Sequence, residues 1–167
     1  MEAVLALMLG GALLACMLLI ALARAARPAQ SGLLGGRLRP CPDRPNCVCS
    51  EDSETTAWVE PLGFEGPPTK VWERLQITIR EMGGKIQSQS DEYIWATFRT
   101  KVFRFVDDME FRLLTDDGVI HVRSASRIGY SDLGLNRRRV EELRARFTPG
   151  IGDMDSSPTE GTRHSSG

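Results

Sequence analysis

Apolar residues along the chain change their spacing near position 85. Upstream, they recur every three or four residues and predict a helix that ends at Gly83 and Gly84; its stripe comprises Val71, Trp72, Leu75, Ile79 and Met82. Downstream, apolar and polar residues alternate, which predicts strands at about 85–90, 93–104, 106–115 and 118–127. A tight-turn signal, Asp116, Asp117 and Gly118, separates the last two strands.

A second helix is expected after the last strand. Val140, Leu143 and Phe147 share one face there, behind a capping residue that is either Asp132 or Asn136. Since the strand connections are short, an antiparallel meander is the simplest topology. The pattern predicts an α+β fold: a two-layer domain with a four-stranded antiparallel meander covered by two helices.

The chain begins with an unbroken apolar run at 3–23. About twenty such residues can span a bilayer as a helix, so we expect residues 1–23 to be a transmembrane anchor. A cleaved signal peptide and a lipoprotein signal at Cys16 are the alternatives. The anchor is favoured because Glu2, not a positive charge, precedes the run, and because the run continues past Cys16.

The remaining boundaries follow from composition. Residues 24–40 are rich in Gly, Ala, Arg and Pro and are expected to form a linker. Residues 41–147 would form the globular domain, with an irregular cysteine-bearing lead-in, and roughly one hundred residues suffice for one core. Residues 148–167 lack an apolar pattern and are expected to be disordered.

Two features give opposite indications of the membrane side. Arg24, Arg27, Arg37 and Arg39 follow the apolar run and place the domain in the cytoplasm, on a single-pass membrane protein. Cys41 and Cys47 could close a small disulfide loop, which would favour the periplasmic, oxidising side. We give the charge rule more weight. The lipid bilayer is the expected partner of the first helix.

Composition argues against several other partners. The net charge of −1 gives no field that would attract nucleic acid. The cysteine spacing C-x5-C-x-C and the remoteness of His121 and His164 argue against a metal site. No glycine-rich phosphate loop is present, and we expect no cofactor.

Closely spaced arginines are the main candidates for binding chemistry. Arg123 and Arg127 lie on one face of a strand, and Ser126 on the other. Their guanidinium groups suit an anionic small molecule or protein partner, although Asp107 and Asp108 on the neighbouring strand are the natural internal partners.

A second arginine group lies at the start of the last helix. Arg137, Arg138 and Arg139 oppose the helix dipole there, and need a negative partner. This is either an anionic ligand or the internal acids Asp132, Glu141 and Glu142. Tyr130, in the preceding loop, would shape the mouth of a pocket.

An enzyme is the alternative to a binding module. Asp107, Asp108 and Glu110 could supply an acid and a base beside Tyr130. Adjacent strand residues point to opposite faces, however, so Asp107 and Asp108 do not easily converge on one substrate atom. We therefore favour a non-catalytic, membrane-anchored module for an anionic ligand or partner, with a purely structural accessory domain as a further alternative.

Two sequence blocks carry a family resemblance. They are CPDRPNCVCS at 41–50 and the acid- and arginine-rich stretch at 105–147. Together they resemble a bacterial and plant family known as the domain of unknown function, number 1499. The resemblance covers roughly 41–147 and implies a fold unit, not a reaction. It also implies a hydroxyl residue at the position that Cys49 occupies here.

Overall fold

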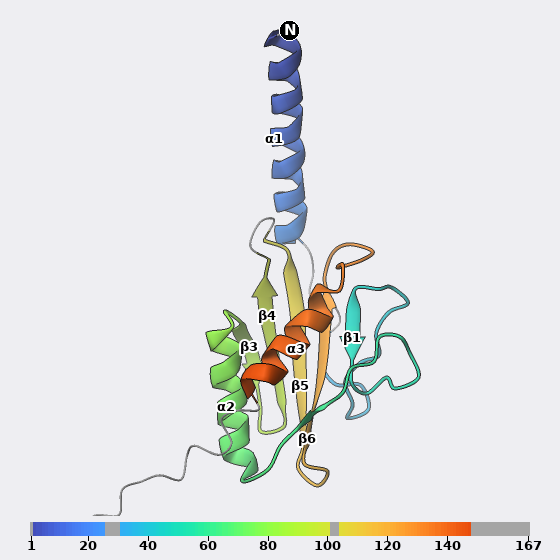
Figure 1. Cartoon of the computed structure of the whole chain (residues 1–167), viewed down its shortest axis with the longest axis vertical. Coiled ribbons are helices and arrows are strands. Elements are labelled where there is room, and N and C mark those ends of the chain that lie inside the picture. Colours follow the sequence, from blue (N-terminus) through green and yellow to red (C-terminus); the bar gives the residue numbers. More distant parts are fainter. Residues whose placement is uncertain (1, 26–30, 101–103, 148–167) are drawn as a thin grey trace, which may run out of the picture.

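The computed structural model describes residues 2–25, 31–100 and 104–147. The first element, α1 (Glu2–Ala25), extends away from the folded domain (Figure 1). Many of its apolar side chains are exposed: Val4, Leu5, Leu7, Met8, Leu9, Leu13, Leu14, Met17 and Leu18. Among the described residues, no helix combines the length and apolar character that crossing a membrane requires. The expected transmembrane helix is therefore not confirmed.

The sheet contains the expected antiparallel meander and two further strands. The meander consists of β3 (Lys85–Gln89), β4 (Tyr93–Arg99), β5 (Val106–Leu114) and β6 (Val119–Ser126). The lead-in adds β1 (Cys47–Cys49) and β2 (Leu62–Gly63), which both pair antiparallel with β6. The expectation of four strands was therefore wrong, because strands of three and two residues are too short to show an alternating period.

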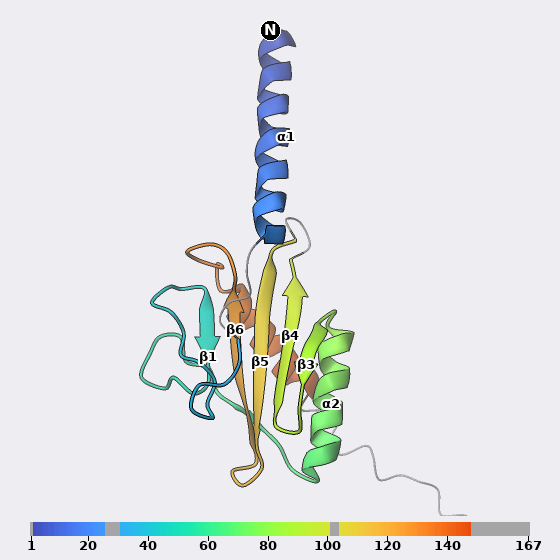
Figure 2. The ribbon, with the colours of Figure 1, turned by 180° about the vertical axis from the view of Figure 1, so that it is seen from behind.

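Two helices and the sheet enclose the core. The helix α3 (Leu135–Phe147) crosses one face of the sheet, and α2 (Pro68–Glu81) lies beside β3 (Figures 1 and 2). The buried apolar residues of the strands and of both helices form one cluster, as the α+β prediction requires. Asp132 caps α3, since its carboxylate accepts the N–H groups of Gly134 and Asn136 at 2.9 and 2.8 Å.

The other face of the sheet is polar, and residues 31–40 lie against it. We call this segment the strap. Its Gly32 N–H donates to Glu110 Oε1 at 2.7 Å, and its Leu38 N–H donates to Glu51 Oε2 at 2.5 Å. Leu38 itself is buried. The segment expected to be a linker thus contacts the domain from residue 31 onward.

Candidate functional site

Acids and arginines on the strap side of β5 and β6 pair with one another. Arg123 NH1 donates to Glu110 Oε2 at 2.8 Å. Arg127 binds Asp108 through two hydrogen bonds, Nε to Oδ2 at 2.9 Å and NH2 to Oδ1 at 2.7 Å. Both carboxylate side chains are completely buried. Buried charges need such partners, because burying an unpaired charge costs on the order of several kcal/mol of folding free energy.

Two aromatic residues of β4 complete these contacts. The Tyr93 hydroxyl donates to Glu110 Oε1 at 2.6 Å, and Trp95 Nε1 donates to Asp108 Oδ1 at 2.8 Å. Burial, followed by the bond to Glu110, raises the pKa of the Tyr93 phenol far above its usual range. Sequence reasoning missed both residues, although strand parity places them on the same face as the acids.

Asp107 points to the opposite, helix-covered face. It was expected to pair with Arg123 or Arg127, and this was wrong, because alternation turns it toward α3. There Arg139 NH2 donates to Asp107 Oδ2 at 2.8 Å and Ser126 Oγ donates to Oδ1 at 2.6 Å. We refer to the three pairs together as the charge lattice, which comprises Asp107–Arg139, Asp108–Arg127 and Glu110–Arg123.

The lattice removes the acids from acid–base chemistry. Each carboxylate is neutralised by a guanidinium and hydrogen-bonded a second time. Tyr130, the other residue of the enzyme hypothesis, is 71% exposed and lines a cavity that none of these acids lines. The structure therefore does not bring the proposed catalytic groups together.

A serine–histidine–carboxylate cluster lies beside the strap and was missed from the sequence. Ser50 Oγ lies 3.1 Å from His121 Nδ1, and His121 Nε2 lies 3.8 Å from Glu51 Oε1. Burial first, and then the charges of Arg112 and Arg37, lower the pKa of His121. In the tautomer of the neutral imidazole that leaves Nδ1 without a proton, Nδ1 accepts a hydrogen bond from the Ser50 hydroxyl.

This cluster is unsuited to nucleophilic catalysis. Ser50 is only 6% exposed, and its Oγ already accepts the Val122 N–H at 2.9 Å. Glu51 binds Arg112 and the strap. The cluster accordingly attaches the strap and the lead-in to β6.

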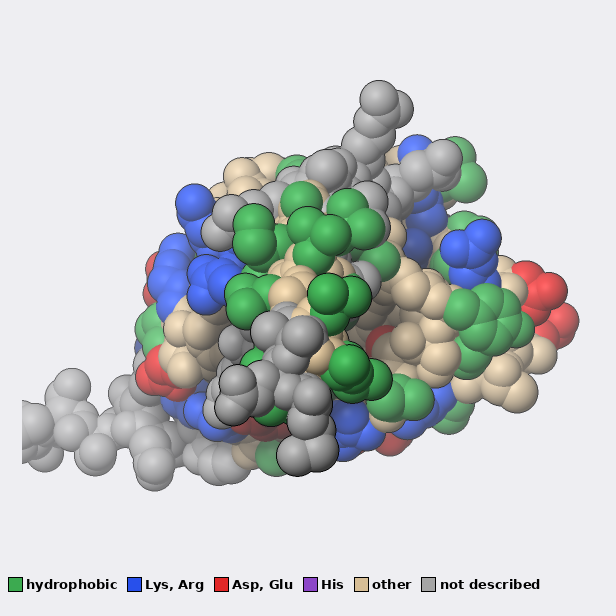
Figure 3. Space-filling model, turned by 90° about the horizontal axis from the view of Figure 1, so that it is seen from above, with side chains coloured by type: hydrophobic (Ala, Val, Ile, Leu, Met, Phe, Trp, Pro, Cys, Tyr) green, Lys and Arg blue, Asp and Glu red, His purple; other side chains and the backbone are tan. Residues whose placement is uncertain are grey.

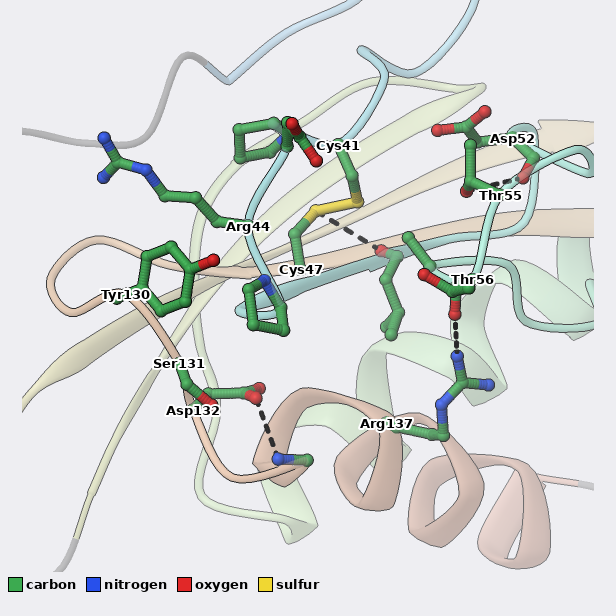
Figure 4. A pocket seen from close by; sticks show the side chains of 16 residues that line it. Cys41, Arg44, Cys47, Asp52, Thr55, Thr56, Tyr130, Ser131, Asp132 and Arg137 are labelled. Carbon is green, nitrogen blue, oxygen red and sulfur yellow. Dashed lines mark hydrogen bonds between the residues drawn. A yellow bond between two sulfur atoms is a disulfide. The ribbon is translucent and has the colours of Figure 1, made fainter.

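A cavity lies between the lead-in and the loop that joins β6 to α3. It has a volume of about 520 Å³, and a disulfide between Cys41 and Cys47 borders it (Figure 4). Tyr130 and Arg137, both candidates from the sequence, line this disulfide pocket. Its charged lining residues are of both signs: Asp43, Arg44, Asp52, Asp132 and Arg137.

The arginines at the start of α3 bind backbone carbonyls. Arg137 donates to the oxygens of Thr56 and Trp58, each at 2.9 Å, and Arg138 donates to Leu133 O at 2.8 Å. The expected pairing with Glu141 and Glu142 was wrong, since those acids bind arginines one turn further along the helix, Arg144 and Arg146. Arg137 and Arg138 thus hold loops in place.

A second cavity, of about 340 Å³, has only basic charged residues in its lining. We call it the basic pocket. It lies on the strap side of the sheet, where β3 begins and β4 ends. No carboxylate occurs among the described residues that line it, which are Gly83, Lys85, Gln87, Thr97, Arg99, Arg104, Val106 and Arg127.

The cations of the basic pocket differ in how they are held. Arg127 is fixed by Asp108 in the charge lattice. Lys85, Arg99 and Arg104 are exposed, and within residues 2–25, 31–100 and 104–147 none of the three forms an ion pair. The pocket therefore keeps an excess positive charge.

Arg104 has an unusual backbone conformation. Its φ of 54° lies in the left-handed region, which costs a residue with a side chain about 1 kcal/mol or more. Two hydrogen bonds between Thr100 and Phe105, both of 2.9 Å, fasten the chain around it. Strain of this kind is often retained at binding sites, where it fixes the direction of a side chain.

The residues predicted to bind anions therefore lie in different places. Arg123 belongs to the charge lattice, and Arg127 belongs to both the lattice and the basic pocket. Tyr130 and Arg137 line the disulfide pocket. Lys85, Arg99 and Arg104 were missed, although Arg99, Lys101 and Arg104 fall within six consecutive residues of the sequence. Among the described residues, no group of three or more His, Cys, Asp or Glu side chains could hold a metal ion.

Comparison with known proteins finds a family that matches most of the chain. Residues 37–147 match the family described as "Protein of unknown function (DUF1499)". No curated protein matches the chain.

Proposed function

Because the chain belongs to the DUF1499 family of proteins of unknown function, membership brings no activity with it, and we propose one from the geometry: a non-catalytic module that binds an anionic group in the basic pocket. The proposal rests mainly on one observation: among the described residues that line this concave site, all four charged ones are cations. A phosphate or carboxylate entering it would replace water around Lys85, Arg99 and Arg104 with charge-assisted hydrogen bonds.

The charge lattice supports a binding role over a catalytic one. Its acids are already paired, so the enzyme alternative would need the pairs to break before a proton could move. A purely structural domain would not need unpaired cations gathered around a cavity. The lattice has its own part in binding, because Asp108 holds the Arg127 guanidinium at the pocket wall.

The cellular location is a further part of the proposal. The exposed apolar side chains of α1 favour association with a lipid bilayer, since water solvates such a surface poorly. The Cys41–Cys47 disulfide favours an oxidising compartment for the domain. The disulfide therefore favours the periplasmic side, whereas the arginines that follow the apolar run favour the cytoplasmic side. A topology reporter fused after Phe147 would decide between them.

Titration of the full chain in uncharged detergent micelles with inorganic pyrophosphate tests the binding function. The test variant is Lys85→Gln/Arg99→Gln. The matched control is Lys70→Gln/Arg146→Gln, which removes the same charge from exposed positions of α2 and α3. We expect the test variant to bind at least about 100-fold more weakly than the control, since it loses two charged hydrogen bonds that contribute about 1.5–3 kcal/mol each. Equal affinities, or no heat of binding to the wild type, would refute the proposal.

A further inference from the structure

The basic pocket lies at the end of the domain from which α1 extends. Strand pairing brings the arginines of the pocket to this end of the sheet. Arg99, the last residue of β4, pairs with Val106, the first residue of β5, and the Arg127 N–H donates to Val106 O at 3.2 Å. In Figure 1 the end of β4 and the start of β5 lie near the base of α1. The cations of the basic pocket therefore come together near an apolar helix from separate parts of the chain: Lys85, the nearby pair Arg99 and Arg104, and Arg127.

Exposed apolar groups occur at the same end. The loop from β6 to α3 begins beside Arg127 and carries Tyr130 and Leu133, which is 84% exposed. Tyrosine is enriched at membrane–water interfaces, where its ring meets the acyl boundary and its hydroxyl meets water. Neither side chain has a role in the core.

The view along α1 combines these features. Figure 3 shows the apolar helix near the centre of this face, with Lys and Arg side chains on several sides of it. These cations are therefore visible from the side of the domain on which α1 lies. Anionic lipids give the surface of a bilayer a negative potential that attracts basic groups close to it.

We infer that the basic pocket receives the phosphate of an anionic lipid headgroup in a bilayer with which α1 associates. This deepens the proposed function and rests on it, because it names the ligand class of the same site. Lys85, Arg99 and Arg104 contact the phosphate, Arg127 forms the fixed wall, and Tyr130 and Leu133 contact the interface beside it.

A headgroup fits these observations better than a free anion. A soluble phosphate compound needs the pocket alone, and leaves the apolar surface of α1 and the exposed loop unexplained. A bilayer covers all three surfaces at once. The helix has no charged side chain between positions 3 and 23, so its surface has no polar stripe of the kind that faces water when a helix packs on a protein partner.

Vesicle flotation of the full chain tests this inference. Vesicles of phosphatidylcholine alone are compared with vesicles that also contain phosphatidylglycerol. We expect α1 to support some binding to both, and the anionic lipid to strengthen it. The variant Lys85→Gln/Arg99→Gln should lose roughly 30-fold in affinity for the anionic vesicles, since each basic side chain near the surface contributes about fivefold. It should lose little affinity for the neutral vesicles. Raised salt should reduce the wild type to the level of the variant.

The outcomes separate the inference from the function beneath it. If pyrophosphate binds in the pocket but phosphatidylglycerol does not strengthen vesicle binding, the headgroup assignment is overturned and the anion-binding function stands. If the lipid strengthens binding equally for the test variant and for Lys70→Gln/Arg146→Gln, the attraction is unspecific and the headgroup assignment again fails. If neither pyrophosphate nor the anionic lipid depends on Lys85 and Arg99, both proposals fall.

Discussion

The Glu110–Arg123 pair offers the sharpest test of how the sheet is held together. Glu110 is completely buried, and the Arg123 side chain is 5% exposed. Removing one member of such a pair leaves the other as an uncompensated buried charge, which costs about 3–5 kcal/mol. Arg123→Met should lie at the lower end, about 3 kcal/mol, because Glu110 keeps the Tyr93 hydroxyl and the Gly32 N–H.

Substituting the other member of the pair, Glu110, should lower the free energy of unfolding by at least as much. Glu110→Gln leaves the Arg123 guanidinium buried with one amide oxygen, and among the described residues Arg123 Nε already has no hydrogen-bond partner. The double variant removes both charges. Its loss should fall short of the sum of the single losses by about 2 kcal/mol, within the range of coupling energies for residues in direct contact.

Urea unfolding followed by tryptophan fluorescence measures these free energies, with the full chain kept dispersed in an uncharged detergent. The control cycle is Glu142→Gln with Arg146→Met, a surface pair whose side chains are 54% and 48% exposed. It should show less than about 1 kcal/mol of coupling. If Arg123→Met costs no more than the control, or if the single losses simply add, the lattice is not a coupled buried network and the reasoning is refuted.

Three further predictions concern other parts of the domain. Replacing Cys41 and Cys47 with Ser should destabilise the chain by about 2 kcal/mol, because the disulfide no longer restricts the unfolded chain by closing a short loop. The urea midpoint under oxidising conditions should fall, and reducing the disulfide of the wild type should lower it by the same amount. Gly84→Ala should destabilise the fold by about 1–3 kcal/mol, because the added Cβ would lie 2.6 Å from the Phe98 ring and 2.8 Å from Ile79. Gly63→Ala has open space around it and should be close to neutral, so equal urea midpoints for the two variants would contradict this prediction. Folding lowers the pKa of His121 from 6.5, so its contribution to stability should be complete above pH 6.5 and should decline as the pH falls toward the pKa of the folded state. His121→Gln should flatten that part of the plot of unfolding free energy against pH, and an unchanged slope would contradict this prediction.

The meander could be predicted because its signals are local. Alternation along β4 and β5 and the turn at Asp116–Gly118 are each contained in a few neighbouring residues. β1 and β2 could not be found in this way, since their conformation comes from pairing with β6, which lies some 55 residues or more further along the chain.

The site was predicted in part. Strand parity correctly places Asp108 on the face of Arg123 and Arg127, and Arg127 does bind Asp108. Parity also gives Asp107 the other face, but not its partner, because Arg139 comes from a helix whose position depends on the whole core. Glu110 was a candidate acid only in the enzyme alternative, and its contacts are with Arg123 and the strap.

The polar face of the sheet has two electrostatic regions, and the position of the strap separates their roles. Where the strap crosses it, Glu110 is matched by a cation and excluded from water, so a substitution there should alter folding. Where β3 begins and β4 ends, Lys85 and Arg99 are exposed beside a cavity without acids among its described lining residues, so their loss should alter binding and leave stability almost unchanged. Arg127 belongs to both regions. Arg127→Met should therefore reduce both stability and anion affinity, whereas Arg123→Met should reduce stability alone; the opposite pattern would mean that the anion binds within the lattice itself.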